Sequence, residues 1–343
     1  MQIIGIDWLA FGLVGGVLLG IALLSRRLLR ILDAQRDSPG KLAQVTIAIL
    51  ILGTIERFCT IIARDGSLAI TAIVAGVAIS LLLVLFSYHA RLLSLSGALS
   101  AFPMGCSIFG MGGFAWALPL LTFFLSSSFL SRIGRSRKAG FDPFFEKGSR
   151  RDAGQVLGNG GIAWILIIIH SYAALPELYF AFAGALAAAQ ADTWATEIGT
   201  MVRDPRAYSV IGLKRVPPGT SGGVSWLGTI GGIAGALLIW VGAWVANRGS
   251  LSVVGIAYSI ALVGISGAMG SLVDSILGAT LQARYFDPVR DKITERPFRQ
   301  TDSGPRVNSL VAGWRWMTND AVNLLCSLTG AAVAILATLL LRS

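Results

Sequence analysis

Two acidic residues close an apolar run, and their spacing points to metal chemistry. Asp192 and Glu197 lie in AAAQADTWATEIGT, residues 187–200, among small side chains. Carboxylate oxygens with neighbouring threonine hydroxyls are the hard ligands that Mg²⁺ prefers. Residues five apart lie about 140° apart on a helix, so both acids reach one ion only where the helix ends or bends, which Gly199 permits. The alternative is ordinary solvation of two acids at the end of an apolar segment.

A third acid lies inside a later apolar run, GISGAMGSLVDSILGATLQ, residues 264–282. Asp274 shares one predicted helix face with Ser271, Ser275 and Gly278, which are spaced at i, i+3, i+4 and i+7. An acid in such a run suggests a functional site. The alternative is a helix face of small residues that serves packing and includes one buried, hydrogen-bonded acid. We predict Asp192, Glu197 and Asp274 as catalytic residues and ligands of Mg²⁺.

Basic and glycine-rich segments could bind phosphate groups. In EKGSRRDAGQVLGNGG, residues 146–161, arginine offers paired donors and the glycines allow close backbone approach at a predicted helix start. A basic loop flanking a membrane is the alternative. In LKRVPPGTSGGVSWLGTIGG, residues 213–232, hydroxyls and exposed N–H groups before a helix could form a phosphate cradle, although the P-loop order is absent. The predicted phosphate ligands here are Lys147, Arg150, Arg151, Gln155, Asn159, Lys214, Arg215, Thr220, Ser221, Gly222 and Gly223.

Polar residues also precede the last apolar run, in TNDAVN, residues 318–323. Asn319 and Asn323 are four apart and share a helix face, with Asp320 beside them. We predict that Asp320 belongs to the catalytic set and that Asn319, Asn323, Ser271 and Ser275 bind substrate or nucleotide.

The elements that must position these residues are membrane helices. The chain is 54% apolar and only 13% charged, and its apolar residues come in runs of the length that crosses a bilayer. We predict an all-α, polytopic bundle of transmembrane helices with about ten spans, or nine if one short run does not cross. The runs lie near residues 6–24, 44–63, 68–86, 92–110, 112–130, 156–175, 177–191, 226–246, 252–273 and 320–341.

The net charge of +10 fits a membrane protein better than a nucleic-acid partner, which we exclude. Most of the 28 Lys and Arg residues fall in loops on one side of the predicted map, which the positive-inside rule makes cytoplasmic. Both termini then lie on the other side. We expect residues 1–130 to be plain spans and residues 131–343 to carry the motif loops. The start of the chain has no transit character, which favours a prokaryotic plasma membrane, with a photosynthetic membrane as the other possibility.

Acids for a metal and basic, glycine-rich segments for phosphates, all on the cytoplasmic side of a membrane, suit phosphoryl transfer to a lipid. The blocks KGSRRDAGQVLGNGG, ADTWATEIGT, VPPGTSGGVSWLGT, GSLVDSILGATLQ and TNDAVN resemble, in that order, those of the membrane family called domain of unknown function 92. That family includes plant phytyl-phosphate kinase and vertebrate transmembrane protein nineteen, and the resemblance covers roughly residues 90–340.

This resemblance implies a kinase of an isoprenoid monophosphate that uses Mg²⁺ and a nucleoside triphosphate, with CTP as the expected donor. Two other functions remain open at this point. One is a transporter or scramblase of an anionic lipid or small anion, and the other is a CTP-dependent cytidylyltransferase-like lipid enzyme. Transport would require polar residues midway through several spans, whereas the polar motifs here cluster at one face, which favours an enzyme.

Overall fold

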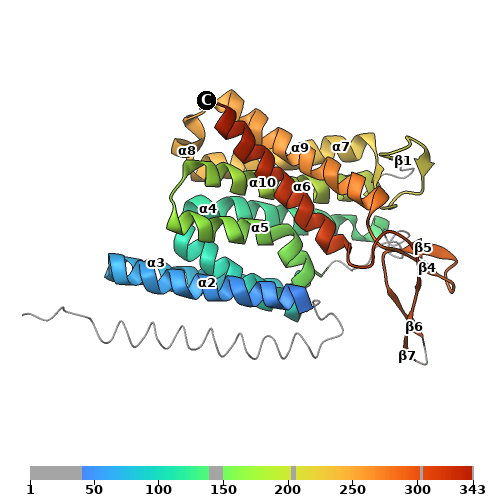
Figure 1. The fold of residues 1–343 in the computed structure, drawn as a ribbon, viewed down its shortest axis with the longest axis horizontal. Coiled ribbons are helices and arrows are strands. Elements are labelled where there is room, and N and C mark those ends of the chain that lie inside the picture. The colour runs from blue at the N-terminus through green and yellow to red at the C-terminus, as the bar shows by residue number, and fades with distance from the viewer. Residues whose placement is uncertain (1–40, 139–149, 202–205, 302–303, 342–343) are drawn as a thin grey trace, which may run out of the picture.

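The protein is a bundle of long α-helices with small strand-containing loops at one end (Figure 1). A computed structural model describes residues 41–138, 150–201, 206–301 and 304–341. The predicted first span, residues 6–24, and Lys147 lie outside these residues. The helices are α2 (Lys41–Asp65), α3 (Ser67–His89), α4 (Leu95–Lys138), α5 (Ala153–Tyr172), α6 (Pro176–Met201), α7 (Trp226–Ala246), α8 (Arg248–Ser252), α9 (Ile256–Thr280) and α10 (Asn319–Leu340).

The predicted class, an all-α polytopic membrane protein, is confirmed. Within the described residues, seven helices are long and apolar enough to cross a membrane: Gln44–Asp65, Ser67–His89, Leu95–Ile133, Ala153–Tyr172, Trp226–Ala246, Ile256–Thr280 and Asn319–Leu340. Helix α6 is not among them, and it covers the short run that the sequence left in doubt. The count of about ten spans and the side on which the termini lie therefore stay predictions.

Helix α4 is two antiparallel helices joined at Gly113. Its 44 residues would extend about 65 Å if straight, yet Nη2 of Arg132, near its end, donates a hydrogen bond to the carbonyl of Ala90, before its start, at 3.1 Å. The reversal occurs at Gly113, whose φ of 56° and ψ of −152° favour a residue without a Cβ. The glycines that divide the predicted runs 92–110 and 112–130 thus mark a real turn. The predicted domain boundary after residue 130 falls inside the second half of α4.

Helix α6 forms the centre of the bundle and contacts α4, α5, α7, α9 and α10. All its residues from Leu178 to Ala191 are buried, and half of them are alanine. These small side chains let neighbouring helices approach closely. A Cβ added at Gly184 would lie 2.5 Å from the carbonyl oxygen of Gly330 on α10, so the two backbones touch there. This packing fixes α6 between the helices that carry the other motifs.

Short antiparallel sheets occupy the loops at one end of the bundle, and the sequence analysis did not predict them. One has the order β2-β1-β3 and pairs Tyr208 with Arg215 and Val224. Another has the order β5-β4-β8, and β6 pairs with β7. Their bounds are β1 (Ala207–Ser209), β2 (Arg215–Val216), β3 (Gly223–Val224), β4 (Arg284–Asp287), β5 (Lys292–Thr294), β6 (Phe298–Thr301), β7 (Gly304–Val307) and β8 (Ser309–Ala312).

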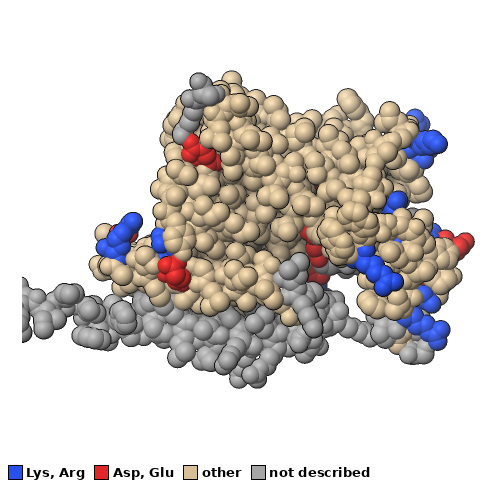
Figure 2. Space-filling model, in the orientation of Figure 1, with Lys and Arg blue, Asp and Glu red and all other residues tan. Residues whose placement is uncertain are grey.

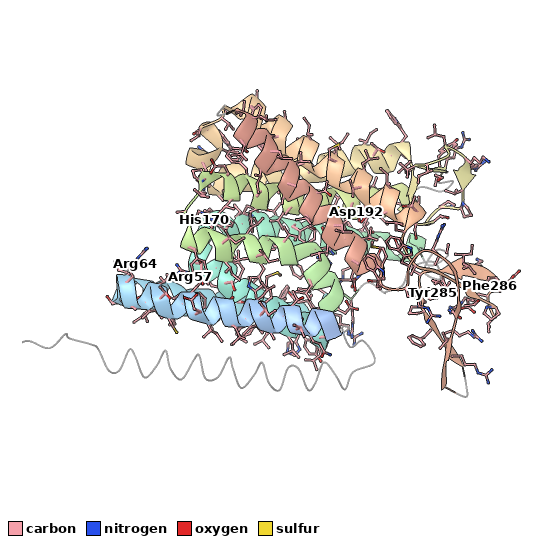
Figure 3. The ribbon with its side chains drawn as sticks, in the orientation of Figure 1. Arg57, Arg64, His170, Asp192, Tyr285 and Phe286 are labelled. Atoms are coloured by element: carbon pink, nitrogen blue, oxygen red, sulfur yellow. The ribbon has the colours of Figure 1, made fainter. Side chains whose placement is uncertain are left out.

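The two ends of the bundle differ in charge. On the face in Figure 2, the Lys and Arg side chains gather mainly at the end that carries the strands. Figure 3 places Arg64 and His170 toward the opposite end from Tyr285 and Phe286 of β4, with Asp192 on the strand side of the bundle. We refer to these as the loop end and the far end. All the predicted motif segments that the structure describes reach the loop end.

Candidate functional site

A polar cavity of about 410 Å³ opens at the loop end, between the ends of α5, α6, α9 and α10 and the turn that joins β2 to β3. Its walls come from segments more than 150 residues apart in the sequence. Most of the predicted site residues line it. These are Arg151, Gln155, Asn159, Asp192, Glu197, Thr220, Ser221, Gly222, Gly223, Ser271, Asp274, Ser275, Asn319 and Asn323.

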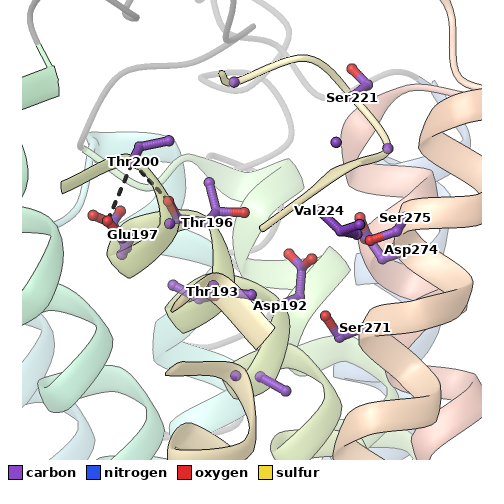
Figure 4. A pocket seen from close by; sticks show the side chains of 18 of the residues that line it. Asp192, Thr193, Thr196, Glu197, Thr200, Ser221, Val224, Ser271, Asp274 and Ser275 are labelled. Carbon is purple, nitrogen blue, oxygen red and sulfur yellow. Dashed lines mark hydrogen bonds between the residues drawn. The ribbon is translucent and has the colours of Figure 1, made fainter. Parts of the chain in front are cut away.

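An acid pair lies in the wall of this cavity. Asp192 of α6 and Asp274 of α9 face each other (Figure 4), and their carboxyl groups interact directly. Oδ2 of Asp274 is buried and accepts no hydrogen bond from the described residues. Two neighbouring carboxylates repel, so a proton or a cation between them would stabilise this arrangement. Ser271 and Ser275 lie on the same face of α9, as their spacing predicted.

Glu197 is separated from this pair. Helix α6 continues through Met201, so the bend that would bring Asp192 and Glu197 to one ion is absent. Glu197 instead accepts a hydrogen bond from Oγ of Ser131 at 2.7 Å, from the end of α4, and lies near the charge of Arg151. The expectation that Asp192 and Glu197 share a metal is therefore not met in this geometry, because a continuous helix turns them to different sides.

Arg151 is the basic residue that the structure brings into the cavity. Its backbone N–H donates to the carbonyl of Leu92 at 3.0 Å, and its own carbonyl accepts from Ser94 N–H at 2.9 Å, which fixes it against the start of α4. Its guanidinium lies over the rings of Phe123 and Phe124, 5.2 and 5.5 Å from their centroids. Burial lowers the pKa of Arg151 to about 10, and the Glu197 charge opposes this shift. Arg151 is therefore positively charged at neutral pH, and its backbone hydrogen bonds fix its position.

Helix α5 begins earlier than the anion-binding prediction requires. Asp152 caps it by accepting from Gln155 N–H at 3.0 Å, while Gln155 Oε1 accepts from Asp152 N–H at 3.2 Å. Asn159 is a full turn further on, and its Nδ2 donates to the Gln155 carbonyl at 2.9 Å. The expected free N–H groups at Asn159 are thus within a helix. Gln155 and Asn159 line the cavity from within this helix instead.

The segment Thr220–Gly223 forms a tight turn rather than a helix start. Gly223 N–H donates to the Thr220 carbonyl at 2.8 Å, and Gly222 has a φ of 77°. A Cβ at Gly222 would lie 2.6 Å from the Ser275 carbonyl, so the turn packs directly on α9. Helix α7 begins later, capped by Ser225, whose Oγ accepts from Gly228 N–H at 3.1 Å. The turn lines the cavity and packs against α9, and it does not form a phosphate-binding helix N-terminus.

The structure also adds residues that the sequence analysis missed. Glu295, which follows β5, accepts hydrogen bonds at Oε1 from Ser221 Oγ and Gln282 Nε2, both at 2.7 Å. Its charge acts on Asp192 and Asp274. Gln282 and Ser131 are the other two cavity residues that the structure adds. The loop around Glu295 has no helical periodicity, so no pattern singled it out. Gln282 ends the segment in which Asp274 was identified.

The model of the family described as integral membrane protein DUF92 matches residues 78–331, which include every cavity-lining segment and end within α10. The chain belongs to the DUF92 family. No solved structure matches it.

The alignments of this DUF92 member with three curated relatives cover most of the length of each relative. Protein PGR of Arabidopsis thaliana is 32% identical over 270 residues, which are 73% of this chain and 91% of that protein. An uncharacterized membrane protein of Synechocystis is 26% identical over 71% of this chain and 82% of its own. Protein VTE6, chloroplastic, of Arabidopsis thaliana is 25% identical over 71% of this chain and 65% of its own.

Some predicted residues of this DUF92 member lie away from the cavity. Arg150, Lys214 and Arg215 are exposed and do not line it. Asp320 lies at the start of α10, where its carbonyl would be 2.9 Å from a Cβ at Gly158 of α5. Their assignments stay predictions, whereas the geometry gathers the acid pair, Arg151 and the polar residues of four helices.

The donors in the cavity fit Mg²⁺ in one particular way. The described residues contain no group of three or more His, Cys, Asp or Glu side chains placed to hold a metal by themselves. Mg²⁺ commonly takes one or two carboxylates and completes its octahedron with substrate phosphates and water. Asp192 and Asp274, with the buried oxygen of Asp274, match that requirement. The acid pair is therefore chemically suited to hold one Mg²⁺ that takes its remaining ligands from outside the protein.

Proposed function

We propose that the chain is a membrane-embedded kinase of an isoprenoid monophosphate, with a nucleoside triphosphate, expected to be CTP, as donor. An oxygen of the lipid monophosphate attacks the γ-phosphorus while the bond from that phosphorus to the β–γ bridging oxygen breaks. The products are a lipid diphosphate and a nucleoside diphosphate. Such a reaction depends mainly on positioning and charge neutralisation. The observation that carries the proposal is that the facing acid pair and Arg151 line the same cavity at one end of a membrane bundle.

The cavity residues divide into roles by chemistry. Asp192 and Asp274 would hold Mg²⁺, which when bound neutralises phosphate charge. Arg151 binds the lipid phosphate by paired N–H donors. The hydroxyls and amides of the walls orient the remaining phosphate oxygens and the nucleotide. Those residues are Gln155, Asn159, Thr220, Ser221, Ser271, Ser275, Asn319 and Asn323.

The far end of the bundle supports an enzyme over a transporter. There the Trp116 ring packs 4.6 Å from Phe182 and 4.7 Å from His170, measured between centroids. The hydroxyl of Tyr179 donates to the carbonyls of Ala115 and Ala243 at 3.0 and 3.1 Å, which ties α6 to α4 and α7. A translocation path would need a continuous line of polar groups through this region, whereas here closely packed aromatic rings surround His170 and Tyr179.

Family membership supports the substrate class, because the motif blocks resemble those of a family that includes phytyl-phosphate kinase. A chloroplastic relative and a relative from Synechocystis fit a photosynthetic membrane. A prokaryotic plasma membrane is equally compatible with the fold. In either case we place the loop end in the cytoplasm or its equivalent, following the charge bias.

The test is transfer of a label from nucleotide to lipid. Purified protein is incubated with phytyl or geranylgeranyl monophosphate, Mg²⁺ and CTP or ATP labelled at the γ-position, and the lipid is extracted. We expect γ-label in a lipid diphosphate. Label in the lipid from α-labelled CTP would instead assign a cytidylyltransferase. No labelled lipid from any prenyl monophosphate and either nucleotide would overturn the proposal.

A further inference from the structure

A second cavity of about 80 Å³ lies between α3, both arms of α4 and the start of α5. Its walls are almost entirely apolar. We call it the apolar groove and define it by Leu83, Val84, Ala101, Leu121, Phe124 and Val156. All of these residues except Val156 come from residues 1–130, in which the sequence analysis expected plain spans without motifs. The proposed phosphoryl transfer by itself gives the groove no role.

The groove adjoins the polar cavity. Three residues, Arg151, Gln155 and Asn159, line both spaces. Arg151 stands at the boundary, since its guanidinium lies over the rings of Phe123 and Phe124, which also belong to the groove wall. One side of the boundary is therefore cationic and polar, and the other is hydrocarbon.

This juxtaposition matches a molecule with an anionic head and a long apolar chain. A phosphate at Arg151 gains charge-assisted hydrogen bonds, and a chain in the groove is removed from water together with the groove's own apolar surface. Leu83, Val84, Leu121 and Phe124 are only partly buried, so the groove is not sealed within the bundle. Because α3 also exposes apolar side chains such as Leu82 and Phe86, its outer face suits contact with lipid.

We propose that the apolar groove binds the hydrocarbon chain of the lipid monophosphate, with the phosphate at Arg151 and the chain between α3 and the two arms of α4. The inference rests on the proposed function for its phosphate, but it assigns a separate site to the chain. The N-terminal helices are then part of the substrate site. Selectivity for chain length resides in α3 and α4, and selectivity for the phosphate resides at Arg151.

The first arm of the test is binding, which needs no catalysis. A geranylgeranyl monophosphate analogue with a diazirine near its distal end is photolysed with the purified full chain, without nucleotide, and the labelled peptides are mapped. We expect label on α3 and α4 residues of the groove, reduced by excess unlabelled geranylgeranyl monophosphate. Label on the outer faces of α7 and α9, or label that the competitor leaves unchanged, would overturn the groove assignment.

The second arm compares chain lengths. Val84→Trp fills the groove, and Val245→Trp, on the exposed face of α7, is the matched control. In Val84→Trp the ratio of KM for geranylgeranyl to five-carbon monophosphate should rise about tenfold, the effect of withdrawing about two methylene groups from an apolar site. An unchanged ratio in a folded Val84→Trp protein would reject the proposal.

The two arms separate this inference from the kinase proposal. Competed labelling of the groove without turnover of any prenyl monophosphate would keep the chain site and reject the kinase. Turnover with labelling outside the groove would do the reverse.

Discussion

The two ends of the bundle are built by different rules, although the same helices form both. At the loop end, side chains that cap helices start α5, α7 and α10: Asp152, Ser225 and Thr318. At the far end, α3 and α9 start after Gly66 and Gly255, which provide no side-chain cap, although the five-residue α8 is capped there by Asn247. The far end is instead filled by aromatic packing around Trp116. Capped helix starts fix the cavity walls, while packing closes the opposite side.

The difference teaches how a mostly apolar chain can hold a polar site. The buried part of α6 is alanine-rich, and apart from Glu177 and Tyr179 at its start its polar residues lie where it nears the loop end. Asp192 directly follows this buried stretch. The cost of placing an acid beside an apolar core falls where a partner and a water-filled cavity are available. Chemistry is therefore expected at the loop end and stability at the far end.

The largest effect should follow removal of one charge from the acid pair. Asp274→Asn keeps the size of the side chain but removes a metal-binding carboxylate, and kcat should fall about 10²- to 10³-fold. The γ-label transfer assay measures this, with monodisperse elution and unchanged helical circular dichroism as the control for folding. Activity within a factor of two of wild type would remove Asp274 from the mechanism.

The next effect concerns the positive charge of Arg151. In Arg151→Lys the planar, paired donors are lost, and kcat/KM for the lipid monophosphate should fall about tenfold, equivalent to 1.4 kcal/mol. Arg151→Gln, which also loses the charge, should have a still lower kcat/KM. Equal activity of the lysine and glutamine variants would mean that charge at this position does not bind phosphate.

The same lysine variant predicts a change in pH dependence. Burial lowers the pKa of Arg151 to about 10, and the same burial acts on a lysine whose ordinary pKa is about 10.4. The lysine loses its proton as pH rises through this lowered pKa, so its kcat/KM should decline at a lower pH than that of wild type. A pH profile from 7 to 10 measures the shift. Superimposable profiles would contradict it.

A smaller effect is expected at the far end, and on stability alone. Trp116→Phe leaves part of the space between His170 and Phe182 unfilled and should lower the free energy of unfolding by about 1–2 kcal/mol. Thermal unfolding in detergent reports the loss, and kcat per folded molecule should be unchanged. A kcat loss without a stability loss would break the proposed division between the ends.

The smallest effect is expected for a basic residue outside the cavity. Lys214 is exposed and does not line the cavity, so Lys214→Ala should change kcat/KM by no more than about twofold, as for a surface charge. The labelled-transfer assay compares it directly with Arg151→Gln. A loss as large as that of Arg151→Gln would restore the sequence-based assignment of Lys214 to phosphate binding.

Much of the fold could be predicted because long apolar runs in the sequence indicate membrane helices. The glycines around residue 112 correctly divided the two arms of α4, and the spacing of Ser271, Asp274 and Ser275 correctly placed them on one face. The start of α5 was also readable, since Asp152 and Gln155 form a capping box. The glycines near Asn159 lie further along the helix and do not mark its start.

Other parts of the site depend on tertiary structure. Gly199 allows a bend in α6, but close packing on α7 keeps the helix straight, as Gly228 of α7 lies 3.4 Å from a Cβ placed at Gly199. Glu295 reaches the cavity only because β5 pairs with β4 and brings the end of its loop to Ser221 and Gln282. No local pattern encodes either outcome.

The most direct measurement is a ³¹P NMR time course of purified protein with a prenyl monophosphate, CTP and Mg²⁺, run in parallel with Asp274→Asn. The account predicts that wild type converts the monophosphate signal into the two coupled signals of a lipid diphosphate, with one nucleoside diphosphate formed per lipid. The variant should leave the substrates unchanged. Release of pyrophosphate, or equal conversion by wild type and Asp274→Asn, would contradict a kinase site at the acid pair.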